Sequence, residues 1–222
     1  MLFKTKGIVF RFVKYRDTSI IVNIFTELFG LQSYIVNSVR SKSSKSKIAL
    51  FQPLTCLDLV VYHRESADIN RISEIKCSSP LVSIPIDIRK SSVALFLTEI
   101  LHKTIREKNE VTPLFTFLDQ SIQILDHLDN NVENFHLQFL LKLTQYLGLE
   151  ASQNELKLII PINVEELELI DLLKEKAYNH HFKISKELRQ QILQHTLLFY
   201  RNHYDSLSHV KSLDVLHAVL ND

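Results

Sequence analysis

Apolar and polar residues alternate with a period of two along the first third of the chain. The alternation runs through residues 8–13, 20–25, 31–36 and 55–62 and, more weakly, 69–77, and β-branched and aromatic residues are frequent in it. This pattern is typical of β-strands. Gly30 stands between the second and third segments, where a hairpin turn needs a positive φ. A short helix is predicted at "KIALF", residues 47–51. Three strands, a short helix and two further strands are the order of an OB-fold, a five-stranded barrel.

The period changes to that of a helix after Pro80 and Pro85. Thr112 is the expected N-cap of a helix with Pro113 at its first position, Ser185 is the expected N-cap of another, and Gly148 is the expected stop of a third. Helices are predicted at 93–105, within 111–129, at 132–148, 165–177 and 186–204, and after Ser212. The predicted fold class is therefore α+β, with an N-terminal five-stranded OB-fold β-barrel (1–80) followed by an all-helical C-terminal domain (81–222).

Composition indicates a globular protein with charge concentrated in one region. The chain has 222 residues, 45% of them hydrophobic, and a net charge of +1. Residues 1–80 carry twelve Lys and Arg against six Asp and Glu, whereas 81–222 carry fourteen against nineteen. A basic first third favours an anionic partner for one domain. The sequence shows neither a signal peptide nor an apolar run long enough for a membrane span, so a cytoplasmic protein is expected, with no membrane partner.

Sequence motifs for catalysis are missing. The three glycines cannot form a phosphate-binding loop, and neither Gly-x-Ser-x-Gly nor His-Glu-x-x-His occurs. Two cysteines are too few for the commonest structural zinc site. The ten histidines are scattered; a metal site from His180, His181 and His195 or His203 is the alternative to ordinary surface histidines. We expect no metal, no cofactor and no small-molecule substrate, and an enzyme is the least expected class.

Basic and aromatic residues cluster at two places in the first third. Cations on and after the first strand, and a serine-lysine segment before "LFQP", are suited to phosphates, and Tyr15 or Tyr34 could stack a base. The alternative is a solvated basic surface. The candidate nucleic-acid contacts are Lys6, Arg11, Lys14, Tyr15, Arg16, Arg40, Lys42, Lys45 and Lys47.

Several motifs, in order, resemble a known family. "KGIVFRFVKYRDTSIIVNIFTELFGLQSYIV" (6–36), "LFQPLTCLDLVVY" (50–62), "FLLKLTQYLGL" (139–149) and "HVKSLDVL" (209–216) are similar to the bacterial recombination mediator RecO family. The resemblance implies an OB domain that binds single- and double-stranded DNA and anneals complementary strands. It also implies partnership with RecR and with the acidic C-terminal tail of single-stranded-DNA-binding protein, loading of the RecA recombinase, and work at the nucleoid.

The chain departs from many members of that family after the Leu-Gly helix. They carry a four-cysteine zinc site there, but "LEASQNELKLIIPINVEELELI" contains no cysteine. Zinc is therefore not expected, and the packing of 149–185 must do that structural work.

An acidic tail would need a hydrophobic slot with a cation at its edge. Lys142 beside Phe139 and Leu143, or Lys103 and Arg106, could supply one; the alternative for the apolar residues is a place in the core of the helical domain. Two other function classes stay open, an RNA-binding OB-fold protein and a protein-binding adaptor.

Overall fold

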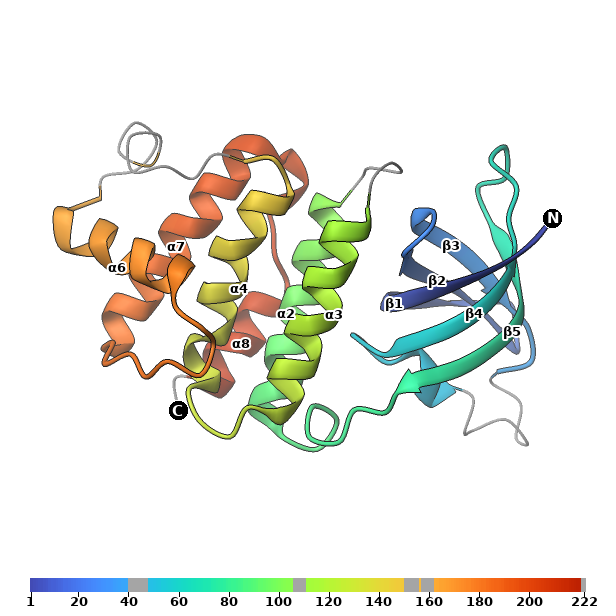
Figure 1. Ribbon diagram of the computed structural model, residues 1–222, viewed down its shortest axis with the longest axis horizontal. Helices are drawn as coiled ribbons and strands as arrows, with labels where there is room; N and C mark the ends of the chain where they lie inside the picture. The colour runs from blue at the N-terminus through green and yellow to red at the C-terminus, as the bar shows by residue number, and fades with distance from the viewer. Residues whose placement is uncertain (40–47, 106–110, 150–155, 157–161, 221–222) are drawn as a thin grey trace. The chain divides into compact units, whose positions relative to one another are not determined.

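The computed structural model describes residues 1–39, 48–105, 111–149, 156 and 162–220 (Figure 1). Its contacts divide the chain into two compact units, residues 1–82 with 105–122 and residues 83–104 with 123–222. The elements are β1 (Leu2–Tyr15), β2 (Ser19–Thr26), β3 (Gly30–Val36), η2 (Ala49–Phe51), β4 (Cys56–Tyr62), β5 (Asn70–Ser79), α2 (Ile88–Thr104), α3 (Thr112–His127), α4 (Val132–Tyr146), α6 (Val164–Glu175), α7 (Lys186–His203), η3 (Asp205–Leu207) and α8 (Ser212–Leu220).

The five strands of the first unit form a closed barrel in the order β1-β2-β3-β5-β4. All pairs are antiparallel except β3 with β5, which meet in parallel at Tyr34–Asn70 and Ile35–Arg71. This is the predicted OB-fold, and the short helix before β4 is present as η2. Gly30 has the expected positive φ, 62°.

β1 pairs with two neighbouring strands, and one extra residue determines which of its side chains point out of the barrel. Its first part pairs with β4 and its later part with β2. The register with β2 shifts between Val9 and Arg11, which leaves Phe10 as a bulge. Because side chains alternate along a strand, one added residue exchanges the inward and outward positions. Even-numbered residues such as Lys4 and Lys6 are therefore outward before the bulge, and odd-numbered ones such as Arg11 and Val13 after it.

The inward positions fill the barrel with a hydrophobic core. It contains Val9, Ile20, Val22, Ile24, Tyr34, Val39, Phe51, Leu57, Leu59 and Val61. Gly7 belongs to this interior, because a Cβ added there would lie 2.6 Å from Ile24 Cγ2 and 2.8 Å from Leu59 Cδ1. The glycine lets two large side chains close over the backbone of β1.

The first part of α3 packs on the outside of the barrel. Phe25 stacks on Phe10 with ring centres 5.8 Å apart and on Phe115 with ring centres 6.1 Å apart. All three are nearly fully buried. The helix begins one residue before its predicted start: Phe115 N donates to Val111 O, so Thr112 is the first helical residue and not the N-cap. Pro113 is still in the first turn, where a missing N–H is tolerated.

The second unit is helical, with the elements that the 3.6-residue pattern predicts. Ser185 caps α7 by accepting from Leu188 N at 3.2 Å, and Gly148 ends α4 with φ 67°. Asn163 and Glu166 form a reciprocal capping box at the start of α6. Each predicted helix is present, with ends that differ by a few residues.

Side chains of α4 and its N-cap residue hold the end of α6 and the chain that follows it. Gln138 Nε2 donates to the carbonyls of Leu173, Lys176 and Ala177, at 3.1–3.4 Å. Asn131 Nδ2 donates to the carbonyls of Tyr178 and His180, both at 3.0 Å. These carbonyls face the interior, where an unpaired acceptor is costly. Side-chain donors thus supplement the backbone hydrogen bonds of this stretch, such as Lys176 N to Leu172 O and His180 N to Ala177 O.

Gly7→Ala should destabilise the barrel by about 1–3 kcal/mol, because Ile24 and Leu59 must move from well-packed positions. Urea unfolding followed by circular dichroism measures the change in midpoint. Ser78→Ala, at an exposed position of β5, is the control and should change stability by less than about 0.5 kcal/mol. An unchanged midpoint for Gly7→Ala would contradict the close packing at this glycine.

Candidate nucleic-acid interface

The outward side chains of β1, β2 and β3 form a polar row that contains no acid. Arg11 lies opposite Asn23, and Asn23 lies opposite Ser33. Asn23 Nδ2 donates to Ser33 Oγ at 2.8 Å. We call Arg11, Asn23 and Ser33 the polar row; it offers one exposed cation and neutral hydrogen-bonding groups on a sheet surface.

A second row follows the pairing register around all five strands. It starts at Leu2 on β1, passes through β4, β5, β3 and β2, and returns to β1 at Val13. Three of its members are large apolar or aromatic side chains that are 42–52% exposed: Leu2, Tyr62 and Val13. We call the complete set the outer belt; it consists of Leu2, Tyr62, Arg71, Ile35, Ile21 and Val13.

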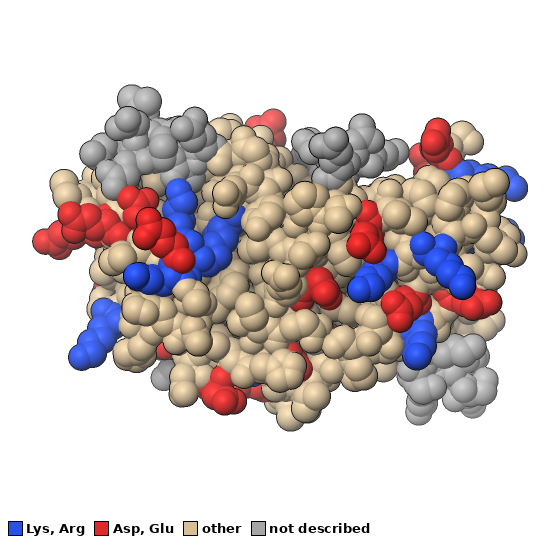
Figure 2. Space-filling model, in the orientation of Figure 1, with Lys and Arg blue, Asp and Glu red and all other residues tan. Residues whose placement is uncertain are grey.

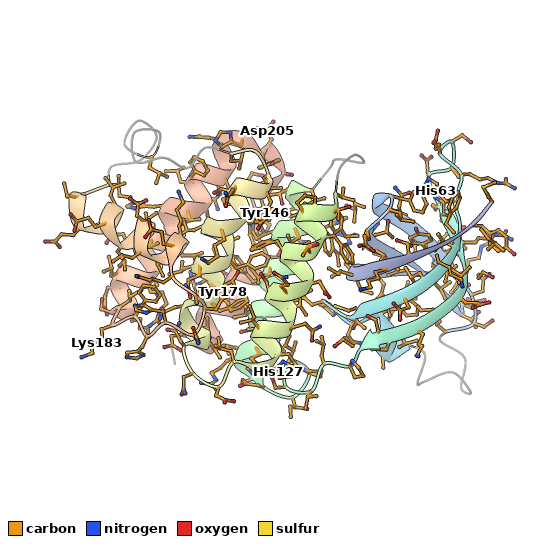
Figure 3. The ribbon with its side chains drawn as sticks, in the orientation of Figure 1. His63, His127, Tyr146, Tyr178, Lys183 and Asp205 are labelled. Atoms are coloured by element: carbon orange, nitrogen blue, oxygen red, sulfur yellow. The ribbon has the colours of Figure 1, made fainter. Side chains whose placement is uncertain are left out.

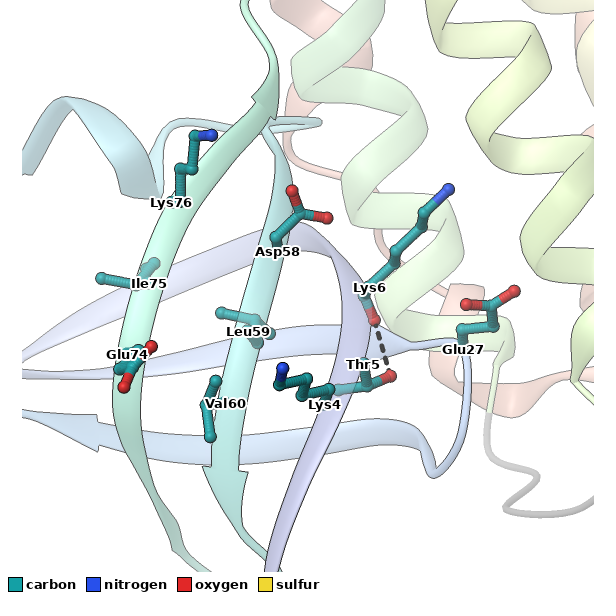
Figure 4. A pocket seen from close by; sticks show the side chains of 10 residues that line it. All are labelled: Lys4, Thr5, Lys6, Glu27, Asp58, Leu59, Val60, Glu74, Ile75 and Lys76. Atoms are coloured by element: carbon teal, nitrogen blue, oxygen red, sulfur yellow. Dashed lines mark hydrogen bonds between the residues drawn. The ribbon is translucent and has the colours of Figure 1, made fainter.

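The face formed by β1, β4 and β5 has a different charge pattern. Asp58 lies opposite both Lys6 and Lys76, and Val60 lies opposite both Lys4 and Glu74. These residues line an open groove of about 490 Å³ (Figure 4). Basic and acidic side chains alternate over the part of the barrel seen in Figure 2. A phosphate placed at Lys6 would meet a carboxylate as well as an ammonium group.

The turn between β1 and β2 brings a cation onto an aromatic ring. Arg16 has a positive φ of 52°, and its guanidinium carbon lies 5.3 Å from the centre of the Tyr15 ring. Lys14 is exposed and Tyr15 half-buried. Lys14, Tyr15 and Arg16 therefore adjoin Val13 of the outer belt, since they follow it along the chain.

Tyr34 cannot stack a base, which corrects the expectation from its sequence position. Its side chain points into the barrel and is fully buried. Burial raises the pKa of its hydroxyl, although the nearby Thr26 side chain acts to lower it. The alternating pattern of β3 correctly predicted that its side chains point to two opposite faces, but it did not predict which face points into the barrel.

The cations Arg40, Lys42, Lys45, Lys47 and Arg106 lie outside the described residues. Their roles stay predictions. None of the residues of the outer belt was among the candidates from sequence, and two of them, Tyr62 and Arg71, have side chains suited to bases and phosphates. Only the pairing of β5 with both β3 and β4 brings Arg71 beside Ile35 and Tyr62, and a local pattern carries no signal for it.

The helical unit uses most of the predicted partner-binding residues internally. Phe139 is 2% exposed and Leu143 is fully buried, so both lie in the core. The Lys142 amine donates to the carbonyl of Lys174 near the end of α6 and lies 5.7 Å from the centre of the Tyr178 ring (Tyr178 is labelled in Figure 3). Burial lowers the pKa of Lys142. A cation there complements the helix C-terminus. The burial of these side chains favours a place in the core of the helical domain over binding of a partner.

Lys103 has an equally local role. Its amine pairs with Glu99 at 2.9 Å and donates to the carbonyl of His209. Glu99 in turn accepts from Lys211 N, Ser212 N and Ser212 Oγ at 2.6–3.1 Å. Glu99 and Lys103 therefore fasten the start of α8 to α2.

The histidines considered for a metal pack against different neighbours. The ring centres of His180 and Phe182 are 4.7 Å apart, and those of His203 and Phe199 are 4.9 Å apart. His195 Nδ1 lies 3.8 Å from Glu166 Oε2. Within the described ranges, no group of three or more His, Cys, Asp and Glu side chains is arranged to hold a metal ion.

Comparison with known proteins decides the family. The model of the family "Recombination protein O N terminal" matches residues 1–81, and that of "Recombination protein O C terminal" matches residues 86–155. The chain belongs to the RecO family. It is 34% identical to the DNA repair protein RecO of Flavobacterium johnsoniae over the whole of both chains. The RecO of Phocaeicola vulgatus is 36% identical over 97% of this chain and 98% of that protein.

A third relative aligns over a shorter region. The DNA repair protein RecO of Bacteroides fragilis is 47% identical over 67% of this chain and 62% of its own length. The N-terminal RecO match coincides with the OB-fold barrel, which confirms both the fold class and the family resemblance. None of the helices in the described ranges combines the length and apolar character that a membrane span requires.

Glu99→Gln should weaken the attachment of α8, and the effect should depend on pH. Partial burial raises the pKa of Glu99, but hydrogen bonds from Ser212, Lys103 and Lys211 outweigh burial and lower it to about 2. The ionised carboxylate therefore stabilises the fold above its ordinary pKa of 4.5, and this contribution disappears as the pH falls towards 2. We expect a loss of about 0.5–2 kcal/mol at pH 7, in the range for a helix cap.

Urea unfolding of both proteins from pH 7 to pH 2 measures this. The difference between wild type and Glu99→Gln should shrink below pH 4.5. Glu168→Gln makes the same chemical change at an exposed position of α6 and should show no such trend. A difference that stays constant down to pH 2 would contradict the role of the ionised carboxylate.

Proposed function

We propose that this protein is a DNA-binding recombination mediator that binds single- and double-stranded DNA through its barrel and anneals complementary strands. One observation carries the proposal: the polar row and the outer belt contain two arginines, Arg11 and Arg71, and no acid. The polar row lies on β1, β2 and β3, and the outer belt crosses strands 2 and 3, where OB-folds bind oligonucleotides. The groove lined by Lys4, Lys6, Asp58, Glu74 and Lys76 has balanced charge instead, which makes it a poor phosphate site.

The chemistry of the proposal is electrostatic. Arg11, Arg71, Lys14 and Arg16 would neutralise phosphates and release counterions. Annealing follows because two backbones that share one set of cations repel each other less. No bond is made or broken in this scheme, so the protein would act without catalytic residues. Acting on chromosomal DNA, it would work in the cytoplasm at the nucleoid.

A salt series with a labelled single-stranded oligonucleotide tests the proposal. If about five cations contact phosphates, log K measured by fluorescence anisotropy should fall with log[salt] at a slope of roughly −3.5. The double variant Arg11→Ala/Arg71→Ala should flatten the slope by about 1.4, since each contact contributes about 0.7 on a single strand. Lys4→Ala/Lys76→Ala removes the same charge from the balanced face and should keep the wild-type slope.

The same experiment separates the other function classes. Binding that is absent at moderate salt would favour a protein-binding adaptor and contradict the proposal. RNA of matched sequence that competes better than DNA would favour an RNA-binding protein. Equal effects of the two double variants would mean that net charge, and not the acid-free face, controls binding.

The serine-lysine segment before η2 is a separate part of the proposal. Lys42, Lys45 and Lys47 lie outside the described residues, and their number within six positions supports phosphate binding. The triple reversal Lys42→Glu/Lys45→Glu/Lys47→Glu should abolish most DNA affinity and slow the annealing of two complementary oligonucleotides, while the melting temperature stays nearly unchanged. Wild-type affinity and annealing in this variant would exclude the segment as a contact.

We infer the protein partners from the family alone. RecR, the C-terminal tail of single-stranded-DNA-binding protein and loading of RecA are proposed for this chain because it belongs to the RecO family along its whole length. The internal roles of Lys103, Lys142, Phe139 and Leu143 argue for a tail-binding surface elsewhere on the protein.

A further inference from the structure

We propose that Tyr62 and Arg71 form a subsite in which a base of single-stranded DNA stacks on the tyrosine while the arginine holds the adjoining phosphate. The proposal deepens the DNA binding inferred above and rests on it. It begins from the placement of the two side chains. They are opposite each other on β4 and β5, both point outward, and Tyr62 is 49% exposed.

A bulge gives this pair its outward direction. The β4–β5 register shifts between Val60 and Val61, which leaves Ser73 as an extra residue in β5. Beyond it, Ile72 packs against the barrel core and Arg71 faces out beside Tyr62. Bulges often re-aim a side chain in this manner near binding sites.

The support beneath the pair is rigid. Asn70 is 3% exposed; its Oδ1 accepts from Arg64 N at 3.0 Å, and its Nδ2 donates to Gln32 Oε1 at 3.4 Å. One side chain thus ties the end of β4, the start of β5 and β3. The residue that follows β4, His63, stacks on Phe29 with ring centres 3.8 Å apart (His63 is labelled in Figure 3). A platform fixed before binding loses little entropy when a ligand arrives.

Charge and position favour a single nucleic-acid strand as the occupant. Along the outer belt, Arg71 has Tyr62 on one side and Ile35 on the other, and the belt contains no carboxylate. The belt then leads over β3 and β2 to Val13, beyond which lie Tyr15 and Arg16. Four interstrand steps of about 4.8 Å separate Tyr62 from Val13, roughly 20 Å along the surface. An aromatic-arginine pair therefore lies near each end of an apolar track.

Stacking on Tyr62 requires an unpaired base, so the subsite should distinguish single strands from duplexes. Tyr62→Ala should lower the affinity for an oligo(dT) roughly 5- to 100-fold, with the salt slope unchanged. Its affinity for a duplex of equal length should change less than two-fold. Arg71→Ala should instead reduce the single-strand salt slope by about 0.7. Tyr62→Phe keeps the ring and should bind like wild type, and Tyr146→Ala removes an exposed tyrosine of the helical unit as the control.

A second measurement reads stacking directly. The chain has no tryptophan, so a Tyr62→Trp variant carries a single reporter whose fluorescence oligo(dT) should quench at the concentrations that raise anisotropy. The fluorescence of Tyr146→Trp should not change. Circular dichroism melts confirm that the variants are folded.

The outcomes separate the two proposals. If Tyr62→Ala binds the oligonucleotide as well as wild type does, and the fluorescence of Tyr62→Trp is not quenched, the subsite proposal is wrong. The proposed DNA-binding function is then unaffected. Equal loss on single strands and duplexes, or a loss in Tyr62→Phe as large as in Tyr62→Ala, also overturns stacking. If wild type shows no salt-dependent DNA binding, both proposals fall.

Discussion

Closure of the barrel depends on β1 pairing with two strands at once. Its first part is bonded to β4 and its later part to β2, and the bulge at Phe10 lies where the outward face changes from even-numbered to odd-numbered residues. Without the added residue, the later part of β1 would turn Arg11 and Val13 into the core and Phe12 out to solvent. Both the hydrophobic interior and the composition of the outer surface follow from this single insertion.

The closed register also separates the charges of the barrel. Lys4, Lys6 and Lys76 line one groove together with Glu27, Asp58 and Glu74, so the charges there cancel. Arg11 and Arg71 belong instead to two rows of paired residues that contain no acid. Net charge alone predicts attraction to an anion over the whole domain, whereas the pairing restricts attraction to one surface. Position on the sheet, more than the number of cations, therefore determines where a phosphate backbone would bind.

The elements of this fold could be predicted from sequence because they are encoded locally. Alternation predicted the strands, and helical spacing with residues such as Ser185 and Gly148 predicted the helices. The surface could not be predicted in the same way, since it depends on contacts between distant residues. Tyr34 and Tyr62 both lie in alternating segments, yet one is inside the barrel and the other outside. Asp58 opposes Lys6, and Arg71 joins Tyr62, only through pairing between strands far apart in the chain.

In the helical unit, the side-chain amide of Gln138 holds several backbone carbonyls in place. Gln138 donates to three carbonyls at and after the end of α6, and Asn131 donates to two more in the chain that follows. A contact spread over many apolar side chains tolerates a change in any one of them, whereas replacing this glutamine with an apolar residue strands several buried acceptors together. Most of the connecting chain is held through its backbone, whereas Tyr178 is also held by its ring, which stacks on Phe135 with ring centres 4.4 Å apart. A change at Gln138 or Asn131 therefore disturbs several contacts at once, whereas a change at an exposed position of the connecting chain disturbs few.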